Sequence, residues 1–508
     1  MRKLSVVSEM KVSTVISDLE KIDAPIIILG AVEKAKDDSL VGKDKGSLGK
    51  VIKEIIELDD FKGESGELLF TYTRGELPAK RLLLVGLGKE EELKAEDIRK
   101  ALGNASRKAR DLNVKKVAIS INHFMRNKLP LADIAEAIVQ GIIMGSFQNL
   151  KYKTKDLDKF KHIEELVIFS PDADEKALKS AVKSGKVIAK AVNFCREMAW
   201  GPANDITPTK LAEEAMRLDK EYGIKTTVFD RKKSEEIGLH SFLAVAQGTE
   251  EPPKFIIMDY GSEKKDVETI ALIGKAITFD TGGISLKPSQ GMPSMKADMT
   301  GGAVVIAAME AIAQLKPDLR IVGVVPATDN MPSGKAYHPG DIVKSYSGQT
   351  IEVVSTDAEG RMIINDALTY AARNYKPKAM FDFATLTGSI SVALGNHAIG
   401  YFANDDDLAE ILEKASETSG ERIWRMPLWK VYDQQFKSDV ADFKHTGGRP
   451  GGAITAARFL SKFVEEFPWI HMDIAGVSGQ EKDKDYNPQG SKGAAVRLII
   501  DVIRYWKK

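Results

Sequence analysis

From residue 269 onward, short apolar segments typical of buried strands alternate with longer segments typical of helices. Strands are expected at residues 269–274, 320–325, 350–355, 379–384 and 469–474, and helices at 301–315, 363–375 and 453–467. Such alternation is typical of layered α/β domains, in which helices flank a central sheet. We therefore expect an α/β fold with a mainly parallel central sheet for this part of the chain.

The first third of the chain shows the same alternation in a shorter form. Strands are expected at residues 24–30, 81–88, 114–121 and 165–170, and helices at 92–113 and 131–147. A Lys-rich connector at 151–161 precedes a long helix expected at 172–200. Because 508 residues suffice for two domains, we expect a smaller N-terminal α/β domain at 1–172 and a larger C-terminal α/β domain at 173–508.

The charge balance argues against a dedicated nucleic-acid-binding protein. Lys and Arg together number 73, as do Asp and Glu, so the formal net charge is zero. Residues 1–170 hold 30 basic and 27 acidic side chains, so the neutral total hides no basic domain. Domains that bind nucleic acid usually carry a basic surface, because they contact phosphates. We therefore expect no nucleic-acid partner.

The sequence also predicts a cytoplasmic protein without a membrane span. Cys195 is the single cysteine, which excludes an intrachain disulfide and any Cys-based metal cluster and fits a reducing compartment. Glu9, Lys11 and Asp18 interrupt the apolar region that a secretory signal would need. No run of 18 apolar residues occurs, so no membrane-spanning helix is expected.

Several common catalytic motifs are absent from the chain. No HExxH zinc helix, no P-loop and no GxSxG nucleophile turn occurs. Gly86-Leu87-Gly88 follows a predicted strand, but Glu91 stands where a dinucleotide fingerprint has its third glycine. The chemistry must therefore come from other residues.

Charged side chains stand where predicted strands end. Lys275, Asp280 and Asp357 lie in apolar or glycine-rich surroundings, where a charge is costly to bury unless it is paired or bound to a metal. The carboxyl ends of strands in open α/β sheets are also where functional sites form. These three residues are therefore candidates for a site.

Four carboxylates in this region could balance the charge of two divalent ions. They are Asp280, Asp298, Asp357 and Glu359. Oxygen-rich sites suit Mg, Mn or Zn, and a close pair of metals can activate a water molecule for hydrolysis. On an extended segment, residues 357 and 359 would face the same side.

Lys287 and Arg361 would add positive charge beside the carboxylates, where it could stabilise a developing oxyanion or hold an anion. A structural interpretation is also open. The same acids could form salt bridges and an N-cap before the helix at 301–315. The residue types and spacings alone do not decide between the two interpretations.

Several segments in order resemble the leucyl aminopeptidase family of dinuclear aminopeptidases. The resemblance covers roughly residues 185–508, whereas the first third is only loosely similar, with LLLVGLGK as its best match. The matching segments read IGKAITFDTGG, GISLKPS, MKADMTGGAVV, STDAEGRMIINDAL, ATLTGS, WRMPLW, KSDVADFKHTGGRPGGAITAARFL and MDIAGV. Ala276 stands where the family usually has glycine, and Ser355 where it usually has asparagine.

The resemblance implies a set of metal ligands. Lys275 corresponds to a lysine ligand of one metal, Asp298 completes that site, and Asp357 completes the second. Asp280 and Glu359 correspond to the carboxylates that bridge both ions. The implied cofactors are two divalent ions per subunit, Mn or Zn, with Mg or Co as further candidates, and bicarbonate. His338, His397, His445 and His471 match no ligand position.

The resemblance also implies an activity, which is removal of N-terminal amino acids, leucine and other apolar residues in particular, from small peptides. Lys287 matches a lysine that polarises the scissile carbonyl, and Arg361 an arginine that holds bicarbonate as general base. Positions around the substrate side-chain pocket correspond to Met295, Thr385, Leu386 and Gly388. A homohexamer is implied as well, with an oligomeric or regulatory role for the N-terminal domain.

Two other functions remain as alternatives. One is a DNA-binding regulator, since some bacterial relatives have that additional role. The other is a two-metal phosphoesterase, which the same ion chemistry would permit.

Overall fold

The chain divides into two α/β units, each built around its own sheet. The structure is a computed structural model that describes residues 10–33, 49, 52 and 60–506. The first unit comprises residues 1–193 with 481–489, and the second comprises 194–480 with 490–508. The division falls within helix α4 (Glu175–Trp200). The expected two-domain α/β architecture is therefore confirmed.

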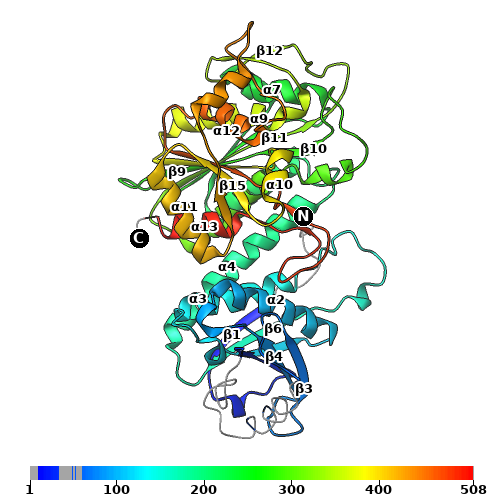
Figure 1. The fold of residues 1–508 in the computed structure, drawn as a ribbon, viewed down its shortest axis with the longest axis vertical. Coiled ribbons are helices and arrows are strands. Elements are labelled where there is room, and N and C mark those ends of the chain that lie inside the picture. Colours follow the sequence, from blue (N-terminus) through cyan, green and yellow to red (C-terminus); the bar gives the residue numbers. More distant parts are fainter. Residues whose placement is uncertain (1–9, 34–48, 50–51, 53–59, 507–508) are drawn as a thin grey trace. The chain divides into compact units, whose positions relative to one another are not determined.

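The first unit is built on a six-stranded sheet with the order β1-β6-β5-β2-β4-β3. Its strands are β1 (Lys11–Ile16), β2 (Ile26–Ala31), β3 (Leu68–Tyr72), β4 (Arg81–Gly86), β5 (Lys116–Ser120) and β6 (Glu165–Ser170). All neighbours run parallel except β3 and β4. Helices α2 (Ala95–Asp111) and α3 (Leu131–Gly145) pack against each other beside it (Figure 1).

Sequence reasoning found the four inner strands of this sheet but not its two edges. The inner strands β2, β4, β5 and β6 are almost wholly buried and read as continuous apolar runs. The edge strands β1 and β3 are half-exposed and carry polar residues, so their sequences lack that signal.

The second unit is built on a nine-stranded sheet with the order β16-β15-β18-β14-β9-β11-β8-β7, and β10 pairs with β11 off this path. Its strands are β7 (Lys225–Phe229), β8 (Lys254–Tyr260), β9 (Thr269–Gly274), β10 (Ala276–Asp280), β11 (Arg320–Asn330), β14 (Ala379–Ala384), β15 (Ile399–Ala403), β16 (Ile423–Arg425) and β18 (Trp469–Asp473). The centre, β18-β14-β9-β11, is parallel as expected. Antiparallel pairs outside that centre, β15 with β18 and β8 with β11 and β7, make the whole sheet mixed.

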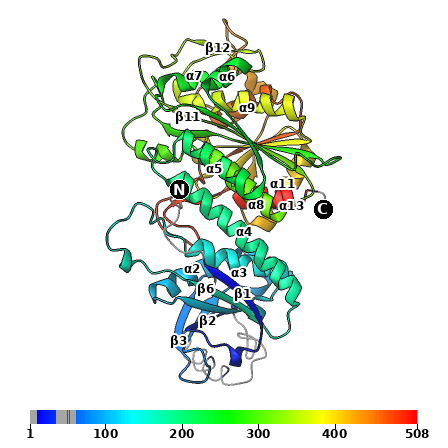
Figure 2. The same cartoon turned by 180° about the vertical axis from the view of Figure 1, so that it is seen from behind.

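Helices cover both faces of this second sheet (Figures 1 and 2). One face carries α7 (His240–Val245), α9 (Glu359–Tyr375) and α12 (Gly452–Leu460). The other carries α5 (Pro208–Tyr222), α8 (Thr300–Leu315), α11 (Asp406–Ser419) and α13 (Val496–Arg504). The main core lies between the sheet and the α7-α9-α12 layer, with Trp469, Phe459 and Leu368 fully buried in it.

The remaining elements of the second unit are short. They are α6 (Arg231–Ile237), α10 (Gly388–Leu394), the small sheet of β12 (Ile342–Lys344), β13 (Thr350–Glu352) and β17 (Phe443–Lys444), and the pair β19 (Gly479–Gln480) and β20 (Gly490–Ser491). Several 3-10 turns join them, among them η7 (Met292–Ala297) and η8 (Thr356–Ala358).

Among the described residues, one helical stretch is long and apolar enough to cross a membrane, Met292–Leu315. However, 83% of its most apolar window is buried inside the structure. Helix α8, which makes up most of the stretch, packs on β9, β11 and β14. The burial is that of a core helix.

Parallel strands of the second sheet end at one common edge, and polar residues follow at that point. Lys275 comes directly after β9, and β10 ends at Asp280. Strand β11 ends at Asn330, Thr385 follows β14, and β18 ends at Asp473. The sheet order therefore gathers residues that are far apart in the sequence.

Candidate metal centre

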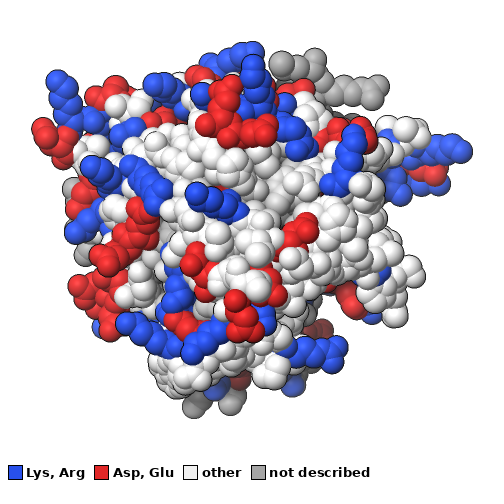
Figure 3. Space-filling model, turned by 90° about the horizontal axis from the view of Figure 1, so that it is seen from above, with Lys and Arg blue, Asp and Glu red and all other residues white. Residues whose placement is uncertain are grey.

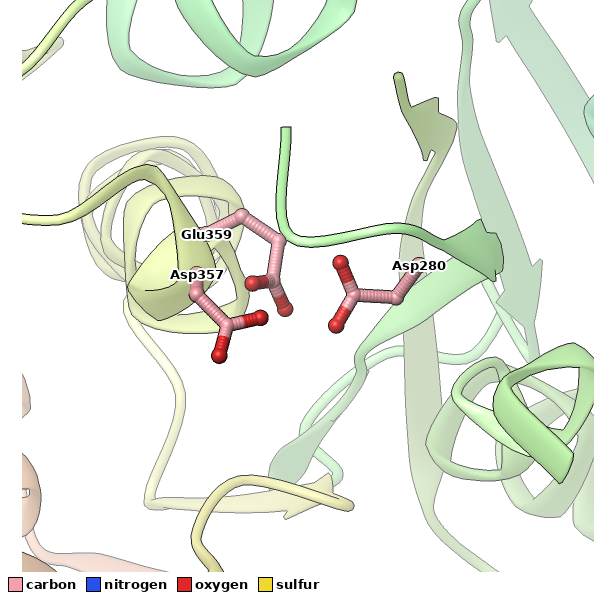
Figure 4. Close-up of side chains that lie close together, drawn as sticks. All are labelled: Asp280, Asp357 and Glu359. Atoms are coloured by element: carbon pink, nitrogen blue, oxygen red, sulfur yellow. The ribbon is translucent and has the colours of Figure 1, made fainter. Parts of the chain in front are cut away.

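Three carboxylates converge at this edge of the sheet. One oxygen from each of Asp280, Asp357 and Glu359 lies within 4.8 Å of the others. Figure 4 shows the three side chains pointing toward one another from the end of β10, from η8 and from the start of α9. Asp280 and Glu359 are buried, whereas the side chain of Asp357 is 37% exposed. The cluster is thus open to solvent on the Asp357 side.

The expected convergence of Asp357 and Glu359 is present, but the backbone between them is not extended. Residues 356–358 form the 3-10 turn η8, and Glu359 begins α9. The hydroxyl of Ser355 starts the turn by accepting a 3.3 Å hydrogen bond from the amide of Asp357. A helical turn, not a strand, therefore brings the two carboxylates to one side.

Lys275 joins the fourth carboxylate to this cluster. Its ammonium lies 2.7 Å from Asp298 Oδ2 and 2.8 Å from Glu359 Oε1, and its side chain is 3% exposed. Burial opposes the charge of Lys275, but the attraction of Asp298, Glu359 and Asp280 outweighs it and raises the pKa. Burial likewise opposes the charge of Glu359, yet Lys275 and Lys287 hold the pKa of that carboxyl below its usual range.

Asp280 is held from several sides. Its Oδ1 accepts hydrogen bonds from the amide of Gly282 at 2.9 Å and from the side chain of Asn330 at 2.8 Å. Its Oδ2 lies 2.8 Å from the ammonium of Lys287, which also pairs with Asp357. Burial and the nearby charge of Glu359 raise the pKa of Asp280 to about 6.

The donor set fits divalent cations. Four carboxylates meet two lysines, so the centre keeps an excess of negative charge. Glu359 Oε2 is buried and has no hydrogen-bond partner within the described part of the chain. A buried carboxylate oxygen without a partner is costly, and a metal ion would satisfy it. A ligand set of carboxylates, with the amine of Lys275 as the one nitrogen ligand, suits Mg, Mn or Zn.

Arg361 lies two residues beyond Glu359 on α9 and is buried. It donates a 2.8 Å hydrogen bond to the carbonyl of His445, and its Nε has no partner within the described residues. Burial lowers the pKa of Arg361 to about 10, although the carboxylates of Glu359 and Asp473 oppose the shift. A buried guanidinium with an unused donor can hold a small anion.

The four candidate pocket residues have different surroundings. Thr385 contacts the charged cluster, because its hydroxyl bonds Asp298 and its carbonyl accepts from Lys275 at 3.0 Å. Leu386 packs against the main core, and Met295 lies half-buried in η7. Gly388 is the first residue of α10, with open space where a Cβ would stand.

The four histidines singled out from the sequence stand apart from the three-carboxylate group. His338 and His397 are exposed. His445 is buried, and its Nε2 donates to the carbonyl of Ser355 at 2.8 Å. His471 is buried as well and pairs through Nδ1 with Asp382 at 2.6 Å. The close group of acids holds no histidine within the described residues.

Sequence reasoning missed two polar residues that support the site, one at a candidate ligand and one beside the candidate pocket. Asn330 bonds Asp280 from the end of β11. Asp473, at the end of β18, accepts hydrogen bonds from the amide of Leu386 at 3.1 Å and the hydroxyl of Thr387 at 2.6 Å. Each is a polar residue that ends an apolar strand, which is the signal that pointed to Asp280.

Comparison with known proteins gives a consistent result. Sequence profiles match the catalytic domain of the cytosol aminopeptidase family at residues 193–500 and its N-terminal domain at 28–156. The chain is 44% identical over 467 residues to a "Probable cytosol aminopeptidase" from Roseiflexus castenholzii, covering 91% of this chain and 95% of that protein. It is 38% identical over 502 residues to a protein of the same name from Alkaliphilus oremlandii, covering 98% of this chain and all of the other.

Solved structures resemble the chain over nearly its whole length. A mutant of tomato leucine aminopeptidase matches with a TM-score of 0.86 at 31% identity, covering 98% of this chain and 97% of that one. The bottromycin maturation enzyme BotP in complex with Mn matches with a TM-score of 0.85 at 30% identity, covering 96% of this chain and all of that one.

Proposed function

The chain belongs to the cytosol aminopeptidase family and is a metal-dependent peptidase that acts at the N-terminus of peptides, and we propose that two divalent ions bound at the carboxylate cluster carry this reaction. The convergence of Asp280, Asp357 and Glu359 beside the Lys275–Asp298 pair is the observation that supports the proposal.

In this proposal, Lys275 and Asp298 would help to hold one ion and Asp357 the other, and Asp280 and Glu359 would serve both. Lysine can ligate only as the neutral amine, and adjacent dications would lower its pKa sufficiently. Mn or Zn is the proposed metal, with Mg and Co as weaker candidates. BotP has been solved in complex with Mn, which favours manganese.

When bound, the metal pair would supply Lewis acidity and an activated water for attack on the first peptide carbonyl. Lys287 would stabilise the oxyanion that forms, because its ammonium already lies among the carboxylates of the centre. Arg361 would hold a bicarbonate ion, the general base, through its unused Nε donor.

We also propose a preference for leucine and other apolar N-terminal residues. Met295, Thr385, Leu386 and Gly388 would line the pocket for the first side chain. A homohexamer in the cytoplasm is proposed from the family resemblance and from the names of the relatives, with the N-terminal domain contributing to assembly or regulation.

Hydrolysis of a leucine anilide tests the proposal directly. The wild type should lose activity with a chelator and regain it with Mn or Zn. Asp357→Ala and Glu359→Ala should abolish turnover while the protein stays folded, whereas Asp318→Asn, at an exposed acid, should leave it unchanged. Full activity in the two alanine variants, or chelator-resistant activity in the wild type, would contradict the two-metal assignment.

The DNA-binding alternative finds no support in the charge distribution or the family match. On the face drawn in Figure 3, basic and acidic side chains are mixed and form no continuous basic stripe. A gel-shift assay at low salt remains its direct test. The phosphoesterase alternative is tested by comparing turnover of a phosphate ester with that of the anilide.

A further inference from the structure

The side chain of Asn330 joins two chain segments that carry candidate metal ligands. It lies at the end of β11 and is 1% exposed. Its Nδ2 donates to Asp280 Oδ1 at 2.8 Å and to the backbone carbonyl of Thr356 at 3.0 Å. Both hydrogens of the Asn330 amide group are thus donated, one to Asp280 at the end of β10 and one to the turn that carries Asp357.

The backbone of Asn330 is tied to the same region. Its carbonyl accepts from the amide of Thr281 at 3.0 Å and from the hydroxyl of Thr281 at 2.7 Å. Thr356 in turn bonds the carbonyl of Gly282 through its hydroxyl at 2.6 Å. The two ligand-bearing segments are therefore cross-linked by several hydrogen bonds, with Asn330 between them.

The orientation of the Asn330 amide follows from its partners. A carboxylate oxygen and a backbone carbonyl can only accept hydrogen bonds, so both must face the NH₂ group. A flipped amide would set its oxygen against two acceptors. The Oδ1 of Asn330 faces the other way, toward Gly283, where a Cβ would come within 2.8 Å of it.

The consequence for Asp280 is that its two oxygens differ. Oδ1 is taken up by the amide of Gly282 and the side chain of Asn330. Oδ2 faces the cluster and lies 2.8 Å from the ammonium of Lys287. A carboxylate held in this way presents one defined oxygen to a cation.

We propose that Asn330 is a positioning residue. It would orient the Asp280 carboxylate so that only Oδ2 faces the metal pair, and it would fix the distance of Asp280 from Asp357 and Glu359. This inference rests on the proposed two-metal function. Without the amide, Asp280 could rotate and the 355–359 turn would lose one of its links to β11. Both ions should then bind more weakly, because Asp280 is proposed to contact both.

The test is titration of metal-free protein with Mn²⁺ by calorimetry, with urea unfolding measured in parallel. Asn330→Leu keeps the approximate volume but removes both hydrogen bonds. The matched control is Asn365→Leu, since Asn365 is also fully buried, donates to Ser241 and leaves its own Oδ1 without a partner in the described residues. If Asn330→Leu does not fold, Asn330→Ser, which keeps one hydroxyl donor, replaces it in the titration.

We expect Asn330→Leu to raise the Mn²⁺ dissociation constants at least tenfold, Asn330→Ser to raise them less, and Asn365→Leu to leave them within about twofold of the wild type. Wild-type affinity in Asn330→Leu, or equal weakening in Asn365→Leu, would overturn the inference. A wild type that binds no Mn²⁺ or Zn²⁺ would instead overturn the proposed function, so the two failures are distinguishable.

Discussion

The hydroxyl of Thr385 donates a 2.7 Å hydrogen bond to Oδ1 of Asp298. This contact orients the acid whose other oxygen pairs with Lys275, so Thr385 supports one side of the metal centre. We predict that Thr385→Val weakens metal binding at the Lys275–Asp298 site about tenfold, the usual effect of losing one hydrogen bond to a charged group. A two-site Mn²⁺ titration measures this.

Thr385→Ser is the control for that prediction, because serine keeps the hydroxyl and loses only a methyl group. It should bind both ions with affinities close to those of the wild type. If Thr385→Val also bound both ions normally and changed only the preference for the first substrate side chain, Thr385 would belong to the pocket and not to the support of Asp298.

Gly360, on helix α9, lies beside the side chain of Lys275. A Cβ at position 360 would come within 2.6 Å of Lys275 Nζ. Replacing glycine by alanine stabilises a helix interior by about 0.5–1 kcal/mol, but Gly360 is the second residue of α9, so a smaller effect is expected there. The atoms that would crowd the new methyl group belong to the flexible side chain of Lys275. We therefore predict that Gly360→Ala changes the free energy of unfolding little but displaces Lys275 and impairs metal binding.

The measurement for Gly360→Ala pairs urea unfolding with the Mn²⁺ content of the protein after dialysis. Gly334→Ala is the matched control, since a Cβ there would meet no atom within 4 Å. It should keep both stability and metal content. A Gly360→Ala protein with full metal content and full activity would contradict the predicted displacement of Lys275.

Lys287 is positioned to act on the reaction rather than on the fold. Its side chain is 22% exposed and reaches Asp280 and Asp357 from the loop after β10. We predict that Lys287→Gln lowers kcat of leucine anilide hydrolysis by about 10²–10³-fold, the range for loss of one oxyanion donor, with a smaller change in KM. Steady-state kinetics at saturating metal measures both constants.

Lys335→Gln, at an exposed lysine, is the control for a simple loss of positive charge and should leave both constants unchanged. An effect of Lys287→Gln confined to KM would assign Lys287 to substrate binding and not to the oxyanion.

The sequence predicted the central strands and the first candidate site residues at strand ends for one physical reason. Strands β9, β11, β14 and β18 are buried on both faces, so they read as apolar runs, and a charge at their ends stands out. The edge strand β7 alternates exposed and half-buried residues and gives no such signal.

The supporting contacts were not predictable in the same way. Asn330 meets Asp280, and Asp473 meets Thr387, only because the sheet order places β11 beside β10 and β14 beside β18. Local sequence carries propensity and periodicity, whereas strand order depends on packing of the whole unit. Resemblance to a family supplied the ligand set that spacing alone left open.

His445 links the metal centre to the pH dependence of stability. Its Nε2 donates to the carbonyl of Ser355, and its Nδ1 lies 3.2 Å from both the amide of Val354 and the carbonyl of Glu352. In the neutral ring, Nδ1 accepts from the amide of Val354. Burial and the charge of Arg361 lower the pKa of His445 from 6.5 to about 4, despite the opposing carbonyls of Ser355 and Glu352. The folded state therefore resists protonation of this ring.

Between pH 6.5 and about 4, the unfolded chain binds a proton at His445 that the folded chain does not. The stabilising contribution is thus fully present above pH 6.5 and is lost as the pH falls through about 4. The shift corresponds to a loss on the order of 3 kcal/mol.

We predict that the free energy of unfolding falls more steeply between pH 7 and pH 4.5 in the wild type than in His445→Gln, because glutamine does not titrate. Urea unfolding at several pH values measures the difference. His338→Gln, at an exposed histidine, should follow the wild type, and parallel curves for His445→Gln and the wild type would contradict the assignment.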